Sequence, residues 1–254
     1  MRKFLLGTSV LIVLAGPALA ADMRTPLYKA PPPVAPAWSW TGCYVGGHAG
    51  GLRANSTEWV VRTPGNLFFG RSLGGHAATG WVGGGQAGCD YQFAGGFVIG
   101  IQGDYDWTNA NGSHVDVFGN THTHNTKSVA SVTGRLGYAW DRFLLYVRGG
   151  GAWERDNYAL TVPPGGFVAP IPGFTALASE TRGGWVLGVG GEYAFTNFLS
   201  GFIEYDYYNF GTRTVNFTNP NTLALIGIDI RERKSVIKGG LNFRFGGGPV
   251  VARY

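Results

Sequence analysis

Side chains alternate in character along most of this chain, and this period of two is the pattern that most limits how it can fold. In residues 97–107, apolar side chains dominate the odd positions, whereas the even positions include Gln102, Asp104 and Asp106. Successive side chains of a β-strand point to opposite faces, so the segment predicts a strand with one apolar and one polar side. After residue 20 there is no apolar run of about 18 residues, so no transmembrane helix is available.

Segments with this alternation recur, and the connections between them are of two kinds. Eight such segments lie near residues 41–53, 77–93, 96–107, 128–140, 143–154, 183–195, 198–210 and 233–245. Short connections fall at Ala94-Gly95, Asp141-Arg142 and Thr196-Asn197, and long ones cover roughly 54–76, 108–127, 155–182 and 211–232. Outer-membrane barrels alternate short periplasmic turns with longer extracellular loops. We therefore expect an all-β fold, a transmembrane up-and-down antiparallel β-barrel of about eight strands with four long extracellular loops.

The aromatic residues indicate which face of these strands meets lipid. A soluble barrel with an apolar interior is the structural alternative. Here the charged face also carries glycine and small residues, whereas the apolar face is bulky and has rings near both strand ends, as at Trp81 and Tyr91 or Trp185 and Tyr193. Rings at two levels are typical of the two interfaces of a membrane. Glycine, 43 of 254 residues, is frequent enough to permit bends and close packing in such a barrel.

The ends of the chain differ from its middle. Residues 1–20 combine Arg2 and Lys3, an apolar run and Ala18-Leu19-Ala20, which together predict a cleaved export signal and a location in the outer membrane. Its removal lowers the net charge from +5 to +3, because it takes away two bases and no acid. Residues 21–37, rich in proline, predict a periplasmic linker, either polyproline-like or disordered. We assign residues 38–245 to the barrel and residues 246–254 to a C-terminal tail.

The expected alternation places one set of charged side chains on the strand faces that point into the barrel. An eight-stranded barrel is just wide enough for side chains to fill, so charges of both signs are expected to pair across it. An ion path is the functional alternative. The interior polar network expected on this basis comprises Asp90, Asp104, Asp106, Arg135, Arg148, Glu154, Glu192, Glu204, Asp206, Lys238 and Arg244.

Cysteine and histidine offer two further candidate sites. Cys43 and Cys89 lie at mirrored positions of the first hairpin, and the periplasm permits a disulfide there, although two free thiols are equally compatible with the pattern. His114, His122 and His124 cluster in the second long loop. His122 and His124 are candidate ligands for haem or a metal ion, but histidines in a polar loop are more often simply solvated. We expect no dedicated metal site.

Motifs of enzymes and of nucleic-acid binding are not supported. Residues 70–74 fit the nucleophile-elbow pattern, but they lie in an expected loop rather than in a strand-turn-helix. Gly83, Gly85 and Gly88 fit a dinucleotide pattern, but a strand continues where a helix is needed. No basic stripe interleaved with aromatic residues suggests nucleic acid. We therefore expect no enzymatic activity.

Four segments together resemble a known family. They are WTGCYVGG at 40–47, GGQAGCDYQ at 84–92, GDYDW at 103–107 and GGLNFRF at 239–245. These resemble the Omp25/Omp31-type outer-membrane immunogenic proteins of alphaproteobacteria, a branch of the OmpA-like barrels. The resemblance implies a porin-like or structural surface antigen of the cell envelope. The final strand also resembles the assembly signal of outer-membrane barrels, with Phe243 and Phe245 as its aromatic residues and Tyr254 as an alternative terminal ring.

These observations predict a structural, surface-exposed outer-membrane protein that contributes to envelope integrity. One alternative is a narrow porin-like channel for ions or small solutes. Another is a haemin-binding surface protein that uses His122 and His124, because haemin binding is attributed to some members of the family that the sequence resembles. The expected partners are outer-membrane lipids, the barrel assembly machinery, and host or environmental surface ligands. No cofactor other than haemin is suggested.

Overall fold

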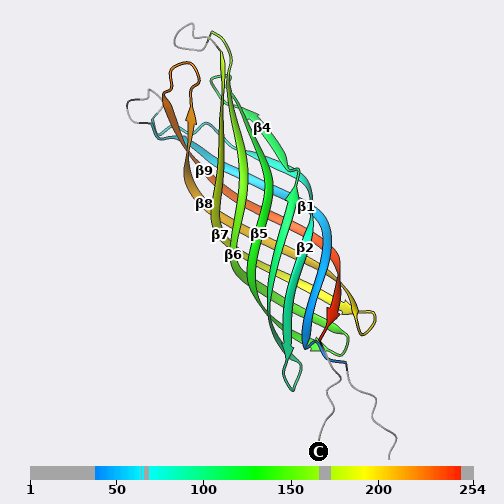
Figure 1. The fold of residues 1–254 in the computed structure, drawn as a ribbon. Coiled ribbons are helices and arrows are strands. Elements are labelled where there is room, and N and C mark those ends of the chain that lie inside the picture. Colours follow the sequence, from blue (N-terminus) through cyan, green and yellow to red (C-terminus); the bar gives the residue numbers. More distant parts are fainter. Residues whose placement is uncertain (1–37, 64, 66–68, 166–172, 247–254) are drawn as a thin grey trace, which may run out of the picture. The chain divides into compact units, whose positions relative to one another are not determined.

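The computed structural model describes residues 38–63, 65, 69–165 and 173–246, apart from the side chains of residues 56–58. Within these ranges, eight long antiparallel strands form a closed ring, and a short ninth strand flanks it (Figure 1). The strands are β1 (Gly42–Val61), β2 (His76–Gln92), β3 (Phe97–Thr108), β4 (Asn111–Val115), β5 (Thr121–Trp140), β6 (Phe143–Val162), β7 (Phe174–Ala194), β8 (Leu199–Thr218) and β9 (Leu225–Phe245). The predicted all-β barrel is confirmed. The predicted export signal, most of the linker and the C-terminal tail lie outside the described residues.

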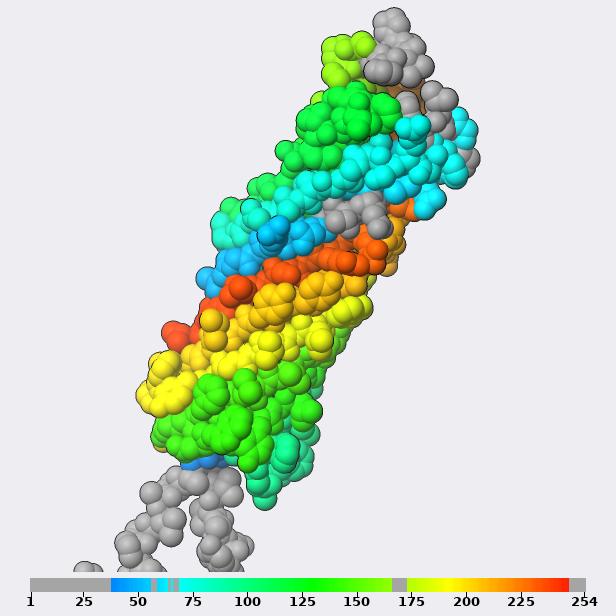
Figure 2. Space-filling model, turned by 180° about the vertical axis from the view of Figure 1, so that it is seen from behind, coloured from blue at the N-terminus to red at the C-terminus, as the bar shows by residue number. Residues whose placement is uncertain are grey.

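Pairing of the first and last strands closes the ring. Strand β1 pairs with β9 over most of its length, with Cys43 opposite Phe245, and it also pairs with β2 on its other side. From behind, β1, β9, β8 and β7 run obliquely side by side around the wall (Figure 2). Every long strand therefore has two hydrogen-bonded neighbours, which is what a sheet needs in order to cross lipid without an open edge. Among the described residues no helix is both long and apolar enough to span a bilayer.

The three turns at the periplasmic end are short, as predicted. Between β2 and β3, Gly95 and Gly96 adopt φ angles of 94° and 92°, conformations that residues with a Cβ rarely adopt. Between β5 and β6, Asp141 has a φ of 51°, and aspartate is among the few side chains that tolerate this region. Tight turns at these positions fix the register of each hairpin.

The bounds of the long outer loops are the main error of the sequence-based boundaries, chiefly for the last two loops. Strands β6 and β7 continue pairing through most of residues 155–182, as far as Val162 opposite Phe174. Strands β8 and β9 likewise pair as far as Thr218 opposite Leu225. Beyond the membrane the alternation inverts, because the outer face meets water while the inner face is apolar: Tyr158 is buried and its neighbour Asn157 is exposed.

The outward face carries an apolar belt with aromatic residues at two levels. Near the periplasmic end the exposed rings include Tyr91, Phe97, Trp140, Phe143, Tyr193, Phe243 and Phe245. Near the outer end they include Trp81, Tyr105, Trp107, Trp153 and Trp185. On β3, the eleven residues from Phe97 to Trp107 span about 25 Å at a rise of about 3.3 Å per residue and a tilt of about 40°. That height equals the apolar band of known outer-membrane barrels.

Candidate functional site: a filled lumen

The structure places all the predicted interior charges inside the barrel. Each of the eleven side chains is at most 6% exposed. They come from seven of the eight ring strands, because each strand presents every second residue to the lumen. They form three groups along the barrel, which we call the periplasmic, middle and outer networks.

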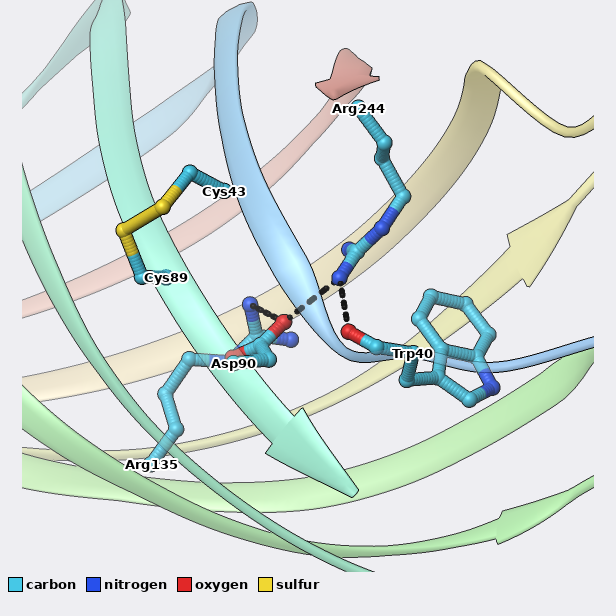
Figure 3. The surroundings of a disulfide bond; sticks show 6 residues. All are labelled: Trp40, Cys43, Cys89, Asp90, Arg135 and Arg244. Atoms are coloured by element: carbon cyan, nitrogen blue, oxygen red, sulfur yellow. Dashed lines mark hydrogen bonds and ion pairs between the residues drawn. A yellow bond between two sulfur atoms is a disulfide. The ribbon is translucent and has the colours of Figure 1, made fainter. Parts of the chain in front are cut away.

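The periplasmic network is a ring of two arginines and two acids. Arg244 donates to Asp90 Oδ2 at 2.9 Å and to Glu192 Oε1 at 3.1 Å. Arg135 donates to Glu192 Oε2 at 2.9 Å, and its Nη1 lies 3.6 Å from Asp90 Oδ2. Figure 3 shows Arg244 and Arg135 approaching Asp90 from different strands. The two positive and two negative charges compensate one another, which buried ions require.

Trp40 seals the barrel beneath this network. Its side chain is fully buried against Leu144 and Ala194. Its indole Nε1 donates to the Asp141 carbonyl at 3.1 Å, and its own carbonyl accepts from Arg244 at 2.7 Å (Figure 3). The segment just before β1 thus places a buried indole at the periplasmic end of the lumen. This role of Trp40 was not predicted, because in the sequence the residue stands out only as part of the segment that resembles a family.

The middle network is built around Arg148 and Lys238. Arg148 donates to Asp104 at 2.8 Å and to Glu204 at 2.9 Å. Lys238 Nζ lies 3.2 Å from Asp206 Oδ2 and 3.4 Å from Glu204 Oε1. These five groups come from β3, β6, β8 and β9 and meet across the lumen, so the space that an ion would need is occupied by paired side chains.

A chain of polar side chains joins the middle network to the periplasmic one. His48 contacts Asp106 and Gln86, and Gln86 donates to Asn242 at 2.7 Å. Asn242 in turn donates to Glu192 at 2.9 Å. His48, Gln86 and Asn242 were not predicted, although all three share the inward parity of their strands and could have been found from it.

An apolar collar separates the middle network from the outer one. It contains Leu52, Val82, Val129, Val186 and Val236, each at most 3% exposed. These side chains belong to one buried apolar cluster that lies across the lumen at this level.

The outer network surrounds Lys234. Lys234 Nζ lies 2.6 Å from Glu154 Oε2 and 3.0 Å from Asp156 Oδ1. Arg182 lies 3.5 Å from Glu154 and donates to the Tyr158 hydroxyl at 2.8 Å. Only Glu154 had been predicted. Asp156, Tyr158 and Arg182 were missed because they fall in residues 155–182, which were assigned to a loop.

Trp59 and four histidines fill the outer end of the lumen. The Trp59 ring lies 4.8 Å from the His122 ring, 5.6 Å from His114 and 5.9 Å from His76, between ring centroids. His124 lies nearby, 6.2 Å from His76. The expectation that His114, His122 and His124 lie in a solvated loop is wrong: His114 is on β4, and His122 and His124 are fully buried on β5.

Burial and neighbouring groups shift the pKa of two histidines of this cluster, which lies beyond the outer aromatic level. Burial and the neighbouring imidazole of His114 lower the pKa of His76 from 6.5 to about 4. Burial also lowers the pKa of His122, against the effect of its 3.0 Å contact with Asp116. Despite partial burial, hydrogen bonds from His122 and Asn120 hold the pKa of Asp116 below its usual value. The lowered pKa values of His76 and His122 favour the neutral form of these two imidazoles.

The other predicted positions lie on the outer surface near the periplasmic end. Cys43 and Cys89 face each other across β1 and β2, and their sulfur atoms are bonded (Figure 3). Phe243 and Phe245 are half-exposed on the lipid-facing side of β9, whereas Tyr254 lies outside the described residues. Within those residues no group of three or more His, Cys, Asp or Glu side chains is arranged to hold a metal ion.

A closed ring of tilted strands with an apolar outer belt and charged interior defines a transmembrane β-barrel of the bacterial outer membrane. The chain belongs to the family of the outer membrane protein beta-barrel domain, whose family model matches residues 8–245. The protein is accordingly an outer-membrane protein.

Named relatives agree with this assignment, and the comparison with solved structures gives outer-membrane proteins as neighbours. The 31 kDa outer-membrane immunogenic protein of Brucella melitensis biotype 1 is 29% identical over 96% of this chain and 100% of its own length. The 25 kDa outer-membrane immunogenic protein of Brucella abortus is 24% identical over 96% of this chain and 99% of its own. The outer membrane protein OprG of Pseudomonas aeruginosa is a structural neighbour at 12% identity and a TM-score of 0.45, covering 83% of this chain and 99% of that one. The predicted Omp25/Omp31-type resemblance is confirmed.

Proposed function

We propose that the protein is a non-conducting structural barrel that stabilises the outer membrane and presents its outer strand ends to the surroundings. The observation that carries this proposal is the filled lumen. Trp40, the apolar collar and the Trp59 cluster close it at three levels, with paired charges between them. On this proposal the protein has no enzymatic activity, and the surface formed by its outer strand ends meets host or environmental ligands.

Biogenesis follows from the same proposal. Residues 1–20 direct export and are removed, and residues 21–37 link the barrel to the periplasm. The barrel assembly machinery reads the final strand, where Phe243 and Phe245 alternate with Asn242 and Arg244 on the opposite face. Mass determination of the purified protein tests the first step: a mature chain that begins at Ala21 is expected, and retention of Arg2 and Lys3 would contradict it.

Single-channel recording in planar bilayers tests the closed lumen. The refolded protein, verified by a heat-modifiable gel shift, should give no reproducible conductance steps. Regular steps would overturn the proposal in favour of a narrow channel. In that case, charge reversal at Arg135 or Lys238, both buried in the lumen, should change ion selectivity.

The geometry gives haemin binding less support than the sequence did. His122 and His124 are fully buried, and their Nε2 atoms lie 3.0 Å from Asp116 and 3.1 Å from Asp156. An external haem would have to displace these contacts before reaching either imidazole. The closed-barrel proposal therefore does not include a haem site.

A further inference from the structure

A pocket with two basic residues opens on the outer surface of the barrel beside the outer aromatic level. It is lined by Tyr105, Trp107, Lys127, Ser128, Arg155 and Asn157, from β3, β5 and β6. Trp107 is 59% exposed, and its ring lies 5.0 Å from that of Tyr105. Exposed tryptophan and tyrosine mark the boundary between acyl chains and headgroups. The pocket therefore lies at the level of the headgroups of the outer leaflet.

A β-bulge places Lys127 in this pocket. Along β5, Thr126 pairs with Asp156 and Ser128 with Arg155, so Lys127 is an extra residue without a partner in the ladder. Thr126 is buried in the lumen, while Lys127 and Ser128 both lie on the outer side. A bulge re-aims a side chain that strict alternation would point elsewhere. Here it adds an ammonium group beside the Arg155 position on the same face.

Among the described side chains, the two cations have no acidic partner. No carboxylate among the described side chains lies within 4.0 Å of the charged nitrogens of Lys127 or Arg155. Two other exposed bases of the outer region differ, since Arg62 pairs with Asp229 at 2.7 Å and Arg213 lies 4.0 Å from Glu180. The pocket thus offers two uncompensated positive charges at the membrane surface, where they attract anionic lipid.

We propose that this pocket binds the phosphate of a lipid headgroup of the outer leaflet, held by Lys127 and Arg155 above the Trp107 ring. A guanidinium can donate two parallel hydrogen bonds to a phosphate, and an ammonium adds a mobile point charge. Ser128 and Asn157 supply neutral donors and acceptors for hydroxyl or amide groups next to that phosphate. The acyl chains of the same lipid would lie along the apolar belt below. This site does not depend on whether the lumen is closed.

Native mass spectrometry of the folded protein in detergent tests the site with defined probes. We expect bis-phosphorylated lipid A to stay bound to the wild-type protein. The double variant Lys127→Gln/Arg155→Gln should lose about tenfold in apparent affinity, because two charge-assisted contacts to phosphate are gone. The charge-matched control Arg62→Gln/Arg71→Gln removes two exposed bases of the β1–β2 connection and should bind like the wild type. Equal losses in both variants would show a general charge effect and overturn the proposal.

Two further measurements use only the wild-type protein, and they show whether the bound phosphate belongs to a lipid. Fully dephosphorylated lipid A should bind the wild-type protein about tenfold more weakly, and equal binding would overturn the proposal. Inorganic phosphate at the concentration of the lipid should not displace it. Complete displacement would show a free-anion site instead of a lipid site. The heat-modifiable gel shift checks the fold of each variant, and the dephosphorylated lipid still decides the question if a variant fails to fold.

Discussion

Arg148 shows how a single residue holds the middle of the barrel. Its guanidinium contacts Asp104 and Glu204 at 2.8 and 2.9 Å, and its Nε lies 3.3 Å from Asp206. These carboxylates are fully buried, so they have no access to water if the arginine is removed. The loss of stability on removing Arg148 therefore comes from leaving buried carboxylates without a partner, and it exceeds that of a lost surface contact.

Replacing Arg148 by methionine, which keeps much of its volume, should therefore destabilise the barrel by about 3–5 kcal/mol. The measurement is the urea dependence of the gel shift for protein refolded in lipid vesicles. Arg71→Met, at an exposed position, is the control and should change stability by less than about 0.5 kcal/mol. Similar midpoints for both variants would mean that the middle network contributes no net stabilisation.

Acid should loosen the outer end through His76. Its pKa is lowered from 6.5 to about 4 by burial and by the charge of neighbouring imidazoles. The unfolded chain therefore binds protons before the folded one, and stability falls as pH drops from about 6.5 to 4. Below that window Asp116, whose folded pKa is also lowered, adds a further loss. Hydrogen exchange of β4 amides should speed up across this range, and His76→Gln should reduce the change. The assignment to His76 would be contradicted if these exchange rates, corrected for the intrinsic effect of pH on amide exchange, did not change across this range.

At the scale of the strands, the parts inside the membrane were predictable and their outer extensions were not. Inside the membrane, residues that face lipid are apolar and residues that face the lumen are often charged. Neighbouring residues therefore differ in polarity, and the alternation of β3 or β9 can be recognised in the sequence. Above the membrane the pattern is reversed, because polar residues face the water outside and many apolar residues face the lumen. Phe217 and Ile228 turn inward there, and a search for bulky outward residues assigns them to loops.

The candidate site divides in the same way. Parity alone located the eleven interior charges, because facing the lumen depends only on position along a strand. Which charge meets which depends on the stagger between strands: Arg148 on β6 reaches Asp104 on β3, two positions round the ring. The bulge at Lys127 shifts parity by one residue and has no local signal in the alternation.

The disulfide joins β1 and β2, which are already paired along their whole overlap. The double variant Cys43→Ser/Cys89→Ser should still form the ring, because those hydrogen bonds do not need the bond. It should lose about 2–4 kcal/mol, the usual effect of removing such a constraint on the unfolded chain. Urea titration of the gel shift measures this loss, and wild-type protein unfolded with a reductant should behave like the variant. A wild-type transition insensitive to reductant would contradict the prediction.

For the whole molecule, the three closures lie at different heights of one lumen, so each should be sufficient to block it. On the proposed function, Trp40 closes the periplasmic end, the collar around Val129 closes the middle, and Trp59 closes the outer end. Opening one end leaves the other two in place. Closure by hydrophobic layers is local, since each layer excludes water by its own packing.

We therefore expect Trp40→Ala and Trp59→Ala to remain silent in planar bilayers, singly and together, because the collar persists. Each should lower stability by about 3–5 kcal/mol through the cavity left behind. The two losses should add within about 0.5 kcal/mol, since the sites are far apart and share no partner. Trp140→Ala, on the lipid-facing side, is the control for loss of an indole without a lumen cavity. Conductance steps from either single variant would show that one tryptophan alone keeps the barrel closed. That result would contradict closure of the lumen by three independent layers.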